Sequence, residues 1–183
     1  MLFYMNNTLK ISERGKNMEE KSAFVMIKCE HKDRLVSAYK QLYSMDKVVS
    51  CNATKGIYDL VLFLRADNME KCLEGIKKLD GIKEADFMPL LSHCSGDGHG
   101  KRKENLLSSY VLVESEKEKK DTLHRLLCSI DTVTSCEPVE GKFDMIVLLQ
   151  SESFGDMDKV IKEQIKYTDG VLRIKEYPVI TMF

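Results

Sequence analysis

The sequence contains an internal duplication, and this repeat limits the possible fold more than any other feature of the chain. Residues 48–64, VVSCNATKGIYDLVLFL, align with residues 133–149, VTSCEPVEGKFDMIVLL, and six of 17 positions are identical at a constant offset of 85. Two shorter blocks match in the same order, one upstream at an offset of 86 and one downstream at an offset of 89. A repeat of this length indicates two copies of one structural unit.

Each copy predicts the same order of elements, namely strand, helix, strand, strand, helix, strand. The strands predicted from β-branched and aromatic runs are 22–30, 47–54, 57–65 and 82–91, then 109–115, 133–139, 143–150 and 171–182. The helices predicted from apolar residues at helical spacing are 33–45, Met69–Leu79, Leu123–Ile130 and Met157–Ile165. The predicted fold class is therefore α+β, with two tandem ferredoxin-like βαββαβ modules whose sheets are antiparallel.

The predicted strands are apolar on both faces. Leu60, Leu62 and Leu64 point to one face of the sheet, and Val61 and Phe63 point to the other. Helices cover one face of such a sheet, and a second apolar face left in water would be a large hydrophobic patch. We therefore expect the sheets of two modules to pack face to face as a dimeric or pseudo-dimeric αβ-barrel, within the chain or between chains.

Composition changes mark the expected domain boundaries. The expected parts are an N-terminal extension (1–21), a first effector-binding-like module (22–91), a linker (92–105) and a second module (106–183). The linker is rich in glycine and then basic, without apolar periodicity. Its potential metal ligands are His93, Cys94, Asp97 and His99. They leave two interpretations open, a solvated linker or a loop that closes around Zn²⁺ or Ni²⁺.

Charge and hydropathy exclude several classes of protein. The chain has 28 basic and 29 acidic residues and a net charge of −1, which argues against general binding to nucleic acid or to an anionic membrane. Its longest aliphatic and aromatic runs are five residues, whereas a spanning helix needs about 20. We therefore expect a cytoplasmic protein with no membrane or direct nucleic-acid partner and no cofactor.

The six cysteines are expected to be reduced thiols, since none of them forms a C-x-x-C pair. Cys51 and Cys136 occupy equivalent strand positions in the two copies and are interpreted as buried, inert thiols. The alternative is that the two cysteines form a metal-binding or redox pair, but no histidines accompany them at the same spacing in both copies. His31 and His124 have no counterpart in the other copy and are interpreted as surface residues.

The two hairpins carry a resemblance to a known family. Gly56-Ile57-Tyr58-Asp59 and Gly141-Lys142-Phe143-Asp144, each inside a βαββαβ unit, resemble the effector-binding domain of leucine-responsive regulatory protein/AsnC regulators. The resemblance covers 22–91 and 107–183. It implies binding of an amino acid or related small molecule between paired sheets, and homo-oligomers. The 21 residues before the first strand are too few for a helix-turn-helix, so DNA binding would require a partner regulator.

The resemblance places a candidate ligand site at these hairpins. The candidate residues are Thr54, Gly56, Tyr58, Asp59, Gly141, Phe143 and Asp144. Asp59 would accept the ligand ammonium, Thr54 and the backbone around Gly56 would hold its carboxylate, and Tyr58 would form the pocket wall. The structural alternative is that the aspartates bond to hairpin amides, the glycines permit the turns and the aromatic rings pack at the interface. Because Val139 replaces Thr54 in the second copy, the first hairpin is expected to bind more tightly.

The sequence contains no duplicated nucleophile–base pair or metal triad, so the expected function is non-catalytic. We expect a sensing and oligomerisation protein that regulates transcription or metabolism through a partner. An ACT-like regulatory module is one alternative, although its ligand site has a glycine in the first strand–helix turn and residues 29–32 contain none. A metal-independent enzyme of the dimeric αβ-barrel class and a structural assembly module are the others.

Overall fold

The computed structural model describes residues 20–91, 103 and 105–182. Most of the expected N-terminal extension and linker, including the potential metal ligands at 93–99, lies outside these residues. Within the described part of the chain, no helix has the length and apolar character needed to cross a membrane.

Each half of the chain forms one βαββαβ module. The first contains β1 (Lys21–Cys29), η1 (Lys32–Arg34), α1 (Leu35–Tyr43), β2 (Val48–Ala53), β3 (Leu60–Ala66), α2 (Met69–Lys77) and β4 (Ile82–Pro89). The second contains β5 (Leu107–Ser115), η2 (Lys117–Lys119), α3 (Lys120–Cys128), β6 (Val133–Pro138), β7 (Met145–Ser151), α4 (Phe154–Lys159), η3 (Val160–Ile165) and β8 (Val171–Pro178). The strand orders are β2-β3-β1-β4 and β6-β7-β5-β8, and every pair is antiparallel. The predicted fold class is confirmed.

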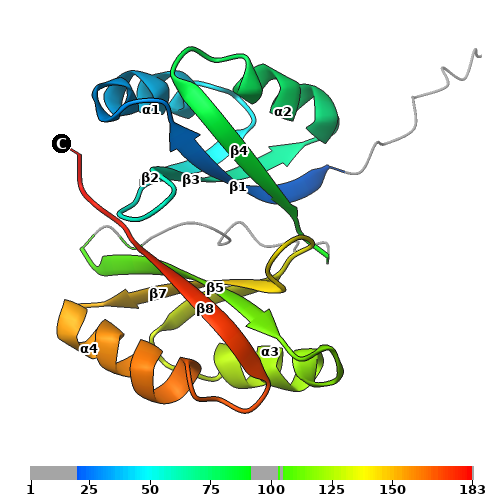
Figure 1. Ribbon diagram of the computed structural model, residues 1–183, viewed down its shortest axis with the longest axis vertical. Helices are drawn as coiled ribbons and strands as arrows, with labels where there is room; N and C mark the ends of the chain where they lie inside the picture. The colour runs from blue at the N-terminus through cyan, green and yellow to red at the C-terminus, as the bar shows by residue number, and fades with distance from the viewer. Residues whose placement is uncertain (1–19, 92–102, 104, 183) are drawn as a thin grey trace, which may run out of the picture.

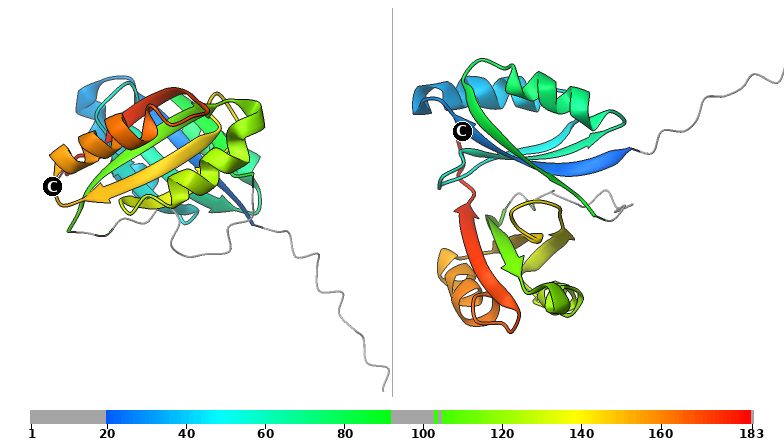
Figure 2. Two further views of the ribbon diagram at one scale, coloured as in Figure 1. Left: turned by 90° about the horizontal axis from the view of Figure 1, so that it is seen from below. Right: turned by 45° about the vertical axis from the view of Figure 1, so that its right-hand side comes forward.

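The two sheets pack against each other, and the helices lie on the two outer faces (Figures 1 and 2). Between the sheets lies a hydrophobic cluster that we call the intersheet core. Its buried residues are Phe24, Met26, Val61, Phe63, Met88, Tyr110, Leu112, Val139, Phe143, Ile146, Leu148, Tyr177 and Val179. Leu60, Leu62 and Leu64 point instead to the core beneath α1 and α2. The apolar second face of the strands is therefore buried by the partner module of the same chain.

The last strand of each module also reaches the hairpin of the other. The Lys55 amide donates to the Pro178 carbonyl at 2.8 Å, and the Glu140 amide donates to the Pro89 carbonyl at 2.9 Å. A side-chain bond adds to these contacts, since Asn52 Nδ2 donates to the Tyr110 hydroxyl at 2.9 Å in a buried position. These bonds close the two sheets into an αβ-barrel and place each β-hairpin against the opposite module.

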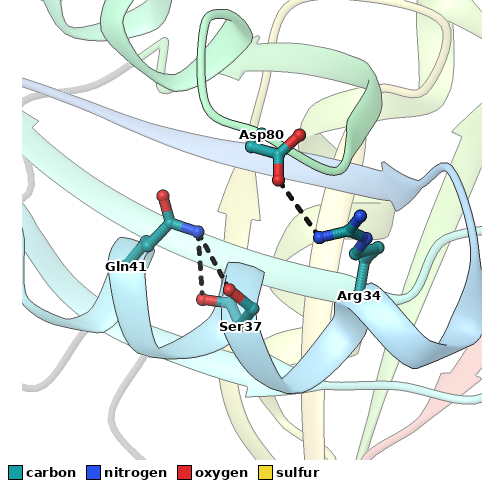
Figure 3. Close-up of polar contacts among 4 residues, drawn as sticks. All are labelled: Arg34, Ser37, Gln41 and Asp80. Carbon is teal, nitrogen blue, oxygen red and sulfur yellow. Dashed lines mark hydrogen bonds and ion pairs between the residues drawn. The ribbon is translucent and has the colours of Figure 1, made fainter.

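An ion pair repeats at the strand–helix turns of both modules. Arg34 lies 3.3 Å from Asp80. Figure 3 shows this ion pair beside the Ser37–Gln41 contact on α1. In the second module, Lys119 lies 2.6 Å from Asp169. All four side chains are substantially exposed, so these pairs contribute little to stability.

The glycines that follow these ion pairs are under a backbone constraint. Gly170 has a φ of +93°, and a Cβ built there would lie 2.9 Å from the Lys119 Cβ. Gly170→Ala is therefore expected to lower the free energy of unfolding by about 1–3 kcal/mol. Gly75→Ala is the matched control, because Gly75 lies on α2 with open space around its Cβ position, and alanine there should stabilise by about 0.5–1 kcal/mol. Urea unfolding of both variants measures the change in the free energy of unfolding. A Gly170→Ala variant as stable as the wild type would contradict the prediction.

Candidate functional site

A pocket of about 140 Å³ lies where the two modules meet. Its lining residues are Met26, Tyr58, Asp86, Phe87, Met88, Leu112, Gly141, Lys142 and Phe143. Five come from the first module and four from the second, so each module supplies part of the wall. Most of the wall is apolar, and the charged and hydroxyl groups come from three residues.

These three polar residues meet at one carboxylate. The Tyr58 hydroxyl donates a hydrogen bond to Asp86 Oδ2. Lys142 Nζ lies 3.2 Å from the same oxygen. Tyr58 belongs to the β2–β3 hairpin and Asp86 to β4, whereas Lys142 comes from the β6–β7 hairpin of the other module. The Asp86 side chain is 29% exposed and that of Lys142 is 75% exposed, so the cluster reaches the surface at Lys142.

The surroundings keep the Tyr58 hydroxyl protonated. Burial raises its pKa, and the hydrogen bond to the Asp86 carboxylate raises it further. The ring centroid of Tyr177 is 5.8 Å from that of Tyr58. Burial raises the pKa of Tyr177 as well. Tyr58 is therefore a neutral hydroxyl at physiological pH, able to donate a hydrogen bond.

The duplication does not repeat this cluster. The aligned pairs are Tyr58 with Phe143, Asp86 with Lys175, and Ile57 with Lys142. At the first hairpin, a Cβ built on Gly56 would lie 2.9 Å from the Tyr177 ring, so that ring packs directly on the hairpin backbone. Gly141 instead has Met88 at 3.8 Å from its Cβ position. The polar groups thus gather at one of two pseudo-equivalent places.

The structure brings together three of the sequence-predicted site residues and leaves four elsewhere. Tyr58, Gly141 and Phe143 line the pocket. Thr54 is buried, and its hydroxyl donates to the Tyr58 carbonyl at 3.0 Å. Gly56 contacts Tyr177, as described above, so neither residue lines the pocket wall.

Asp59 and Asp144 each tie a hairpin to the end of a neighbouring strand. Asp59 Oδ2 accepts a 2.8 Å hydrogen bond from the Cys29 amide. Asp144 Oδ2 accepts from the Ser115 amide at 2.8 Å, and Asp144 Oδ1 lies 3.1 Å from Lys120 Nζ. Burial alone would raise the pKa of Asp144, but these hydrogen bonds outweigh it and lower the pKa. Contact of either aspartate with a ligand stays a prediction.

Asp86 and Lys142 are the site residues that sequence reasoning missed. Asp86 lies in a predicted strand, and the aligned position in the other copy is a lysine. This difference between the copies was the signal in the sequence that could have pointed to Asp86. Lys142 follows the hairpin glycine, where the first copy has an isoleucine. Their proximity depends on how the modules pack, which the sequence pattern does not encode.

Comparison with known proteins identifies the family. The model of the Lrp/AsnC ligand binding domain matches residues 22–95 and again residues 108–182. The chain therefore belongs to this family and carries its domain twice, as the hairpin motifs predicted. Comparison with curated protein sequences found no match.

Among solved structures, the siroheme decarboxylase NirDL shares the two-module fold with a TM-score of 0.70 and 9% identity, covering 88% of this chain and 72% of that one. Chlorite dismutase from Candidatus Nitrospira defluvii aligns with a TM-score of 0.54 and 10% identity, covering 88% of this chain and 91% of that one. AsnC from E. coli aligns over 45% of this chain and 61% of its own, with 14% identity and a TM-score of 0.40.

These structures correct the expected function. The prediction of a non-catalytic sensing protein is wrong, because NirDL and chlorite dismutase, which share the fold over most of the chain, are enzymes. The alternative of an enzyme on the dimeric αβ-barrel fold agrees with these neighbours better. The expectation of a non-catalytic protein depended on the absence of duplicated catalytic groups, whereas the polar cluster of the pocket combines non-equivalent residues of the two modules.

Proposed function

We propose that the protein is an enzyme of the dimeric αβ-barrel class that moves a proton on a small carboxylate-bearing substrate in the pocket between its modules. The observation that carries this proposal is the meeting of Tyr58, Asp86 and Lys142 in an otherwise apolar pocket. A few convergent polar groups in an apolar concavity are typical of substrate sites. The enzyme neighbours with the same fold support the reading.

Each of the three residues has a distinct role in this proposal. Lys142 binds the substrate carboxylate, because its ammonium is exposed at the mouth of the pocket. Asp86 is the base that removes a proton from the carbon next to a carbonyl group. The C–H electron pair moves toward the carbonyl oxygen to form an enolate, and the neutral Tyr58 hydroxyl donates a hydrogen bond to that oxygen. When the substrate also carries a C=C bond between its β and γ carbons, the enolate is a conjugated dienolate, and return of the proton from Asp86 to the γ carbon moves the double bond next to the carbonyl and completes an isomerisation.

The size of the pocket limits the substrate. Its volume of about 140 Å³ is close to that of an engineered cavity of about 150 Å³ that binds benzene. A molecule with a single ring or a short branched chain therefore fits. The apolar walls formed by Met26, Leu112 and Phe143 favour a substrate whose body is apolar and whose charge lies at one end.

A tetrapyrrole does not fit this pocket. NirDL has been solved in complex with an iron-uroporphyrin III analogue, a molecule with four pyrrole rings. In this chain the space between the sheets is filled by Phe24, Phe63 and Tyr110, each at most 1% exposed.

Solvent exchange tests the proposal without knowledge of the product. The protein is incubated in D₂O with a panel of small 2-keto acids and unsaturated carboxylic acids, and carbon-bound deuterium is followed by NMR. We expect enzyme-dependent exchange next to the carbonyl of at least one compound, because proton removal by Asp86 precedes any later step. Ligands that stabilise the protein in a thermal-shift assay but never exchange would contradict the proposal.

A further inference from the structure

A second cluster of potentially metal-binding side chains lies outside the pocket, between α3 and β6 of the second module. His124 and Cys128 are one turn apart on α3, and Cys136 lies on β6 beneath them. One ligand atom from each residue lies within 4.8 Å of the other two. His124 Nε2 is 3.6 Å from Cys128 Sγ. His124, which the sequence indicates is a surface residue, is half-buried and belongs to this cluster.

We propose that His124, Cys128 and Cys136 form a binding site for a thiophilic metal cation such as Zn²⁺. Two sulfurs and one imidazole nitrogen are a ligand set that zinc uses in proteins, with a water molecule in the fourth position. Tetrahedral bond lengths of about 2.3 Å to sulfur and 2.0–2.1 Å to nitrogen place those two atoms about 3.6 Å apart. The observed separation of His124 Nε2 and Cys128 Sγ equals this spacing.

The other copy of the repeat shows that the cluster is specific to the second module. Cys136 aligns with Cys51, but His124 and Cys128 align with Tyr39 and Tyr43. In the first module these two tyrosine rings stack at a centroid distance of 5.7 Å. The same helix face therefore carries an aromatic pair in one module and two metal-binding side chains in the other.

The burial of the three residues suits a site that is closed on one side and open on the other. Cys136 is 7% exposed, His124 is half-buried and Cys128 is exposed, so a cation could enter from the Cys128 side. His124 Nε2 lies 2.9 Å from the Cys136 carbonyl, which already fixes the ring beside the thiols. Metal binding would replace this hydrogen bond.

A metal cation at this site would displace the protons of both thiols, because a thiol that coordinates a metal loses its proton. Glu137 adds a negative charge near both sulfurs, and a bound cation would interact favourably with it.

The experiment is a Zn²⁺ titration of the reduced, metal-stripped full-length protein in competition with a chromophoric chelator. Co²⁺ serves as a second probe, because thiolate ligation gives it a charge-transfer absorption. The test variant, His124→Tyr with Cys128→Tyr, installs the residues of the first module. We expect the wild type to bind one equivalent of Zn²⁺ with Co²⁺–thiolate absorption, and the test variant to lose both.

Two control variants separate this site from other potential ligands. Cys51→Ala removes the equivalent buried thiol of the first module, and Cys94→Ser with His99→Ala removes linker residues that could themselves hold a metal. Both controls should keep the bound equivalent. Zn²⁺ binding that survives in the test variant, that is absent from the wild type, or that disappears in the linker variant would overturn the proposal.

Discussion

Replacement of Phe63 by alanine should lower the free energy of unfolding by about 3–5 kcal/mol. Phe63 is 1% exposed in the intersheet core, and its ring centroid lies 4.9 Å from that of Phe24. The truncation removes buried apolar surface and leaves a cavity between two sheets that neither module can fill alone. Chemical denaturation followed by circular dichroism measures the change.

The matched control for this prediction is Phe154→Ala. Phe154 lies at the start of α4 and is 52% exposed, so its loss should change the free energy of unfolding by no more than about 0.5 kcal/mol. If Phe63→Ala changed the free energy of unfolding as little as this control, Phe63 would not be packed between the two sheets. That result would contradict the closed αβ-barrel.

Replacement of Tyr58 by phenylalanine should reduce the turnover of the proposed reaction by about 10²–10⁴-fold. The variant keeps the ring that lines the pocket and removes only the hydroxyl that donates to Asp86. Because the pKa of Tyr58 is raised, the wild-type hydroxyl stays protonated above the ordinary tyrosine pKa of about 10. Wild-type activity should therefore not decline through deprotonation of Tyr58 as the pH rises from 7 to 10.

The matched control for Tyr58→Phe is Tyr177→Phe. The Tyr177 ring lies beside that of Tyr58, but the residue does not line the pocket. Initial rates of both variants with the same exchanging compound provide the comparison. Equal losses in the two variants would mean that a general disturbance of the aromatic pair, and not the Tyr58 hydroxyl, accounts for the effect.

Much of the fold could be predicted from the duplication and from the strands that are apolar on both faces. Leu62 points to the core beneath α1 and α2, and Phe63 points to the intersheet core. This alternation follows directly from the pleat of a strand. The sequence could not tell whether the partner sheet belongs to the same chain. That outcome depends on how the hairpin of each module meets the last strand of the other.

The candidate site was predictable only in part. The hairpin motif led to Tyr58, Gly141 and Phe143, which line the pocket, because turn residues and neighbouring aromatic rings are visible locally. Asp86 faces the pocket because β4 pairs with β1 in a particular register, with Asp86 opposite Met26. Lys142 reaches it from another module. Such contacts arise from packing over long sequence separations, which local motifs do not report.

If Asp86 removes a proton from a substrate carbon, Asp86→Asn and Glu84→Gln should differ in their ability to exchange that proton with solvent. Glu84 lies two residues earlier on β4, is exposed and does not line the pocket. Glu84→Gln therefore removes a carboxylate from the same strand but leaves the pocket lining unchanged. The measurement is the rate of deuterium incorporation from D₂O into a compound that the wild type exchanges. We predict that Asp86→Asn abolishes incorporation and Glu84→Gln retains it. Incorporation by Asp86→Asn at the wild-type rate would contradict the claim.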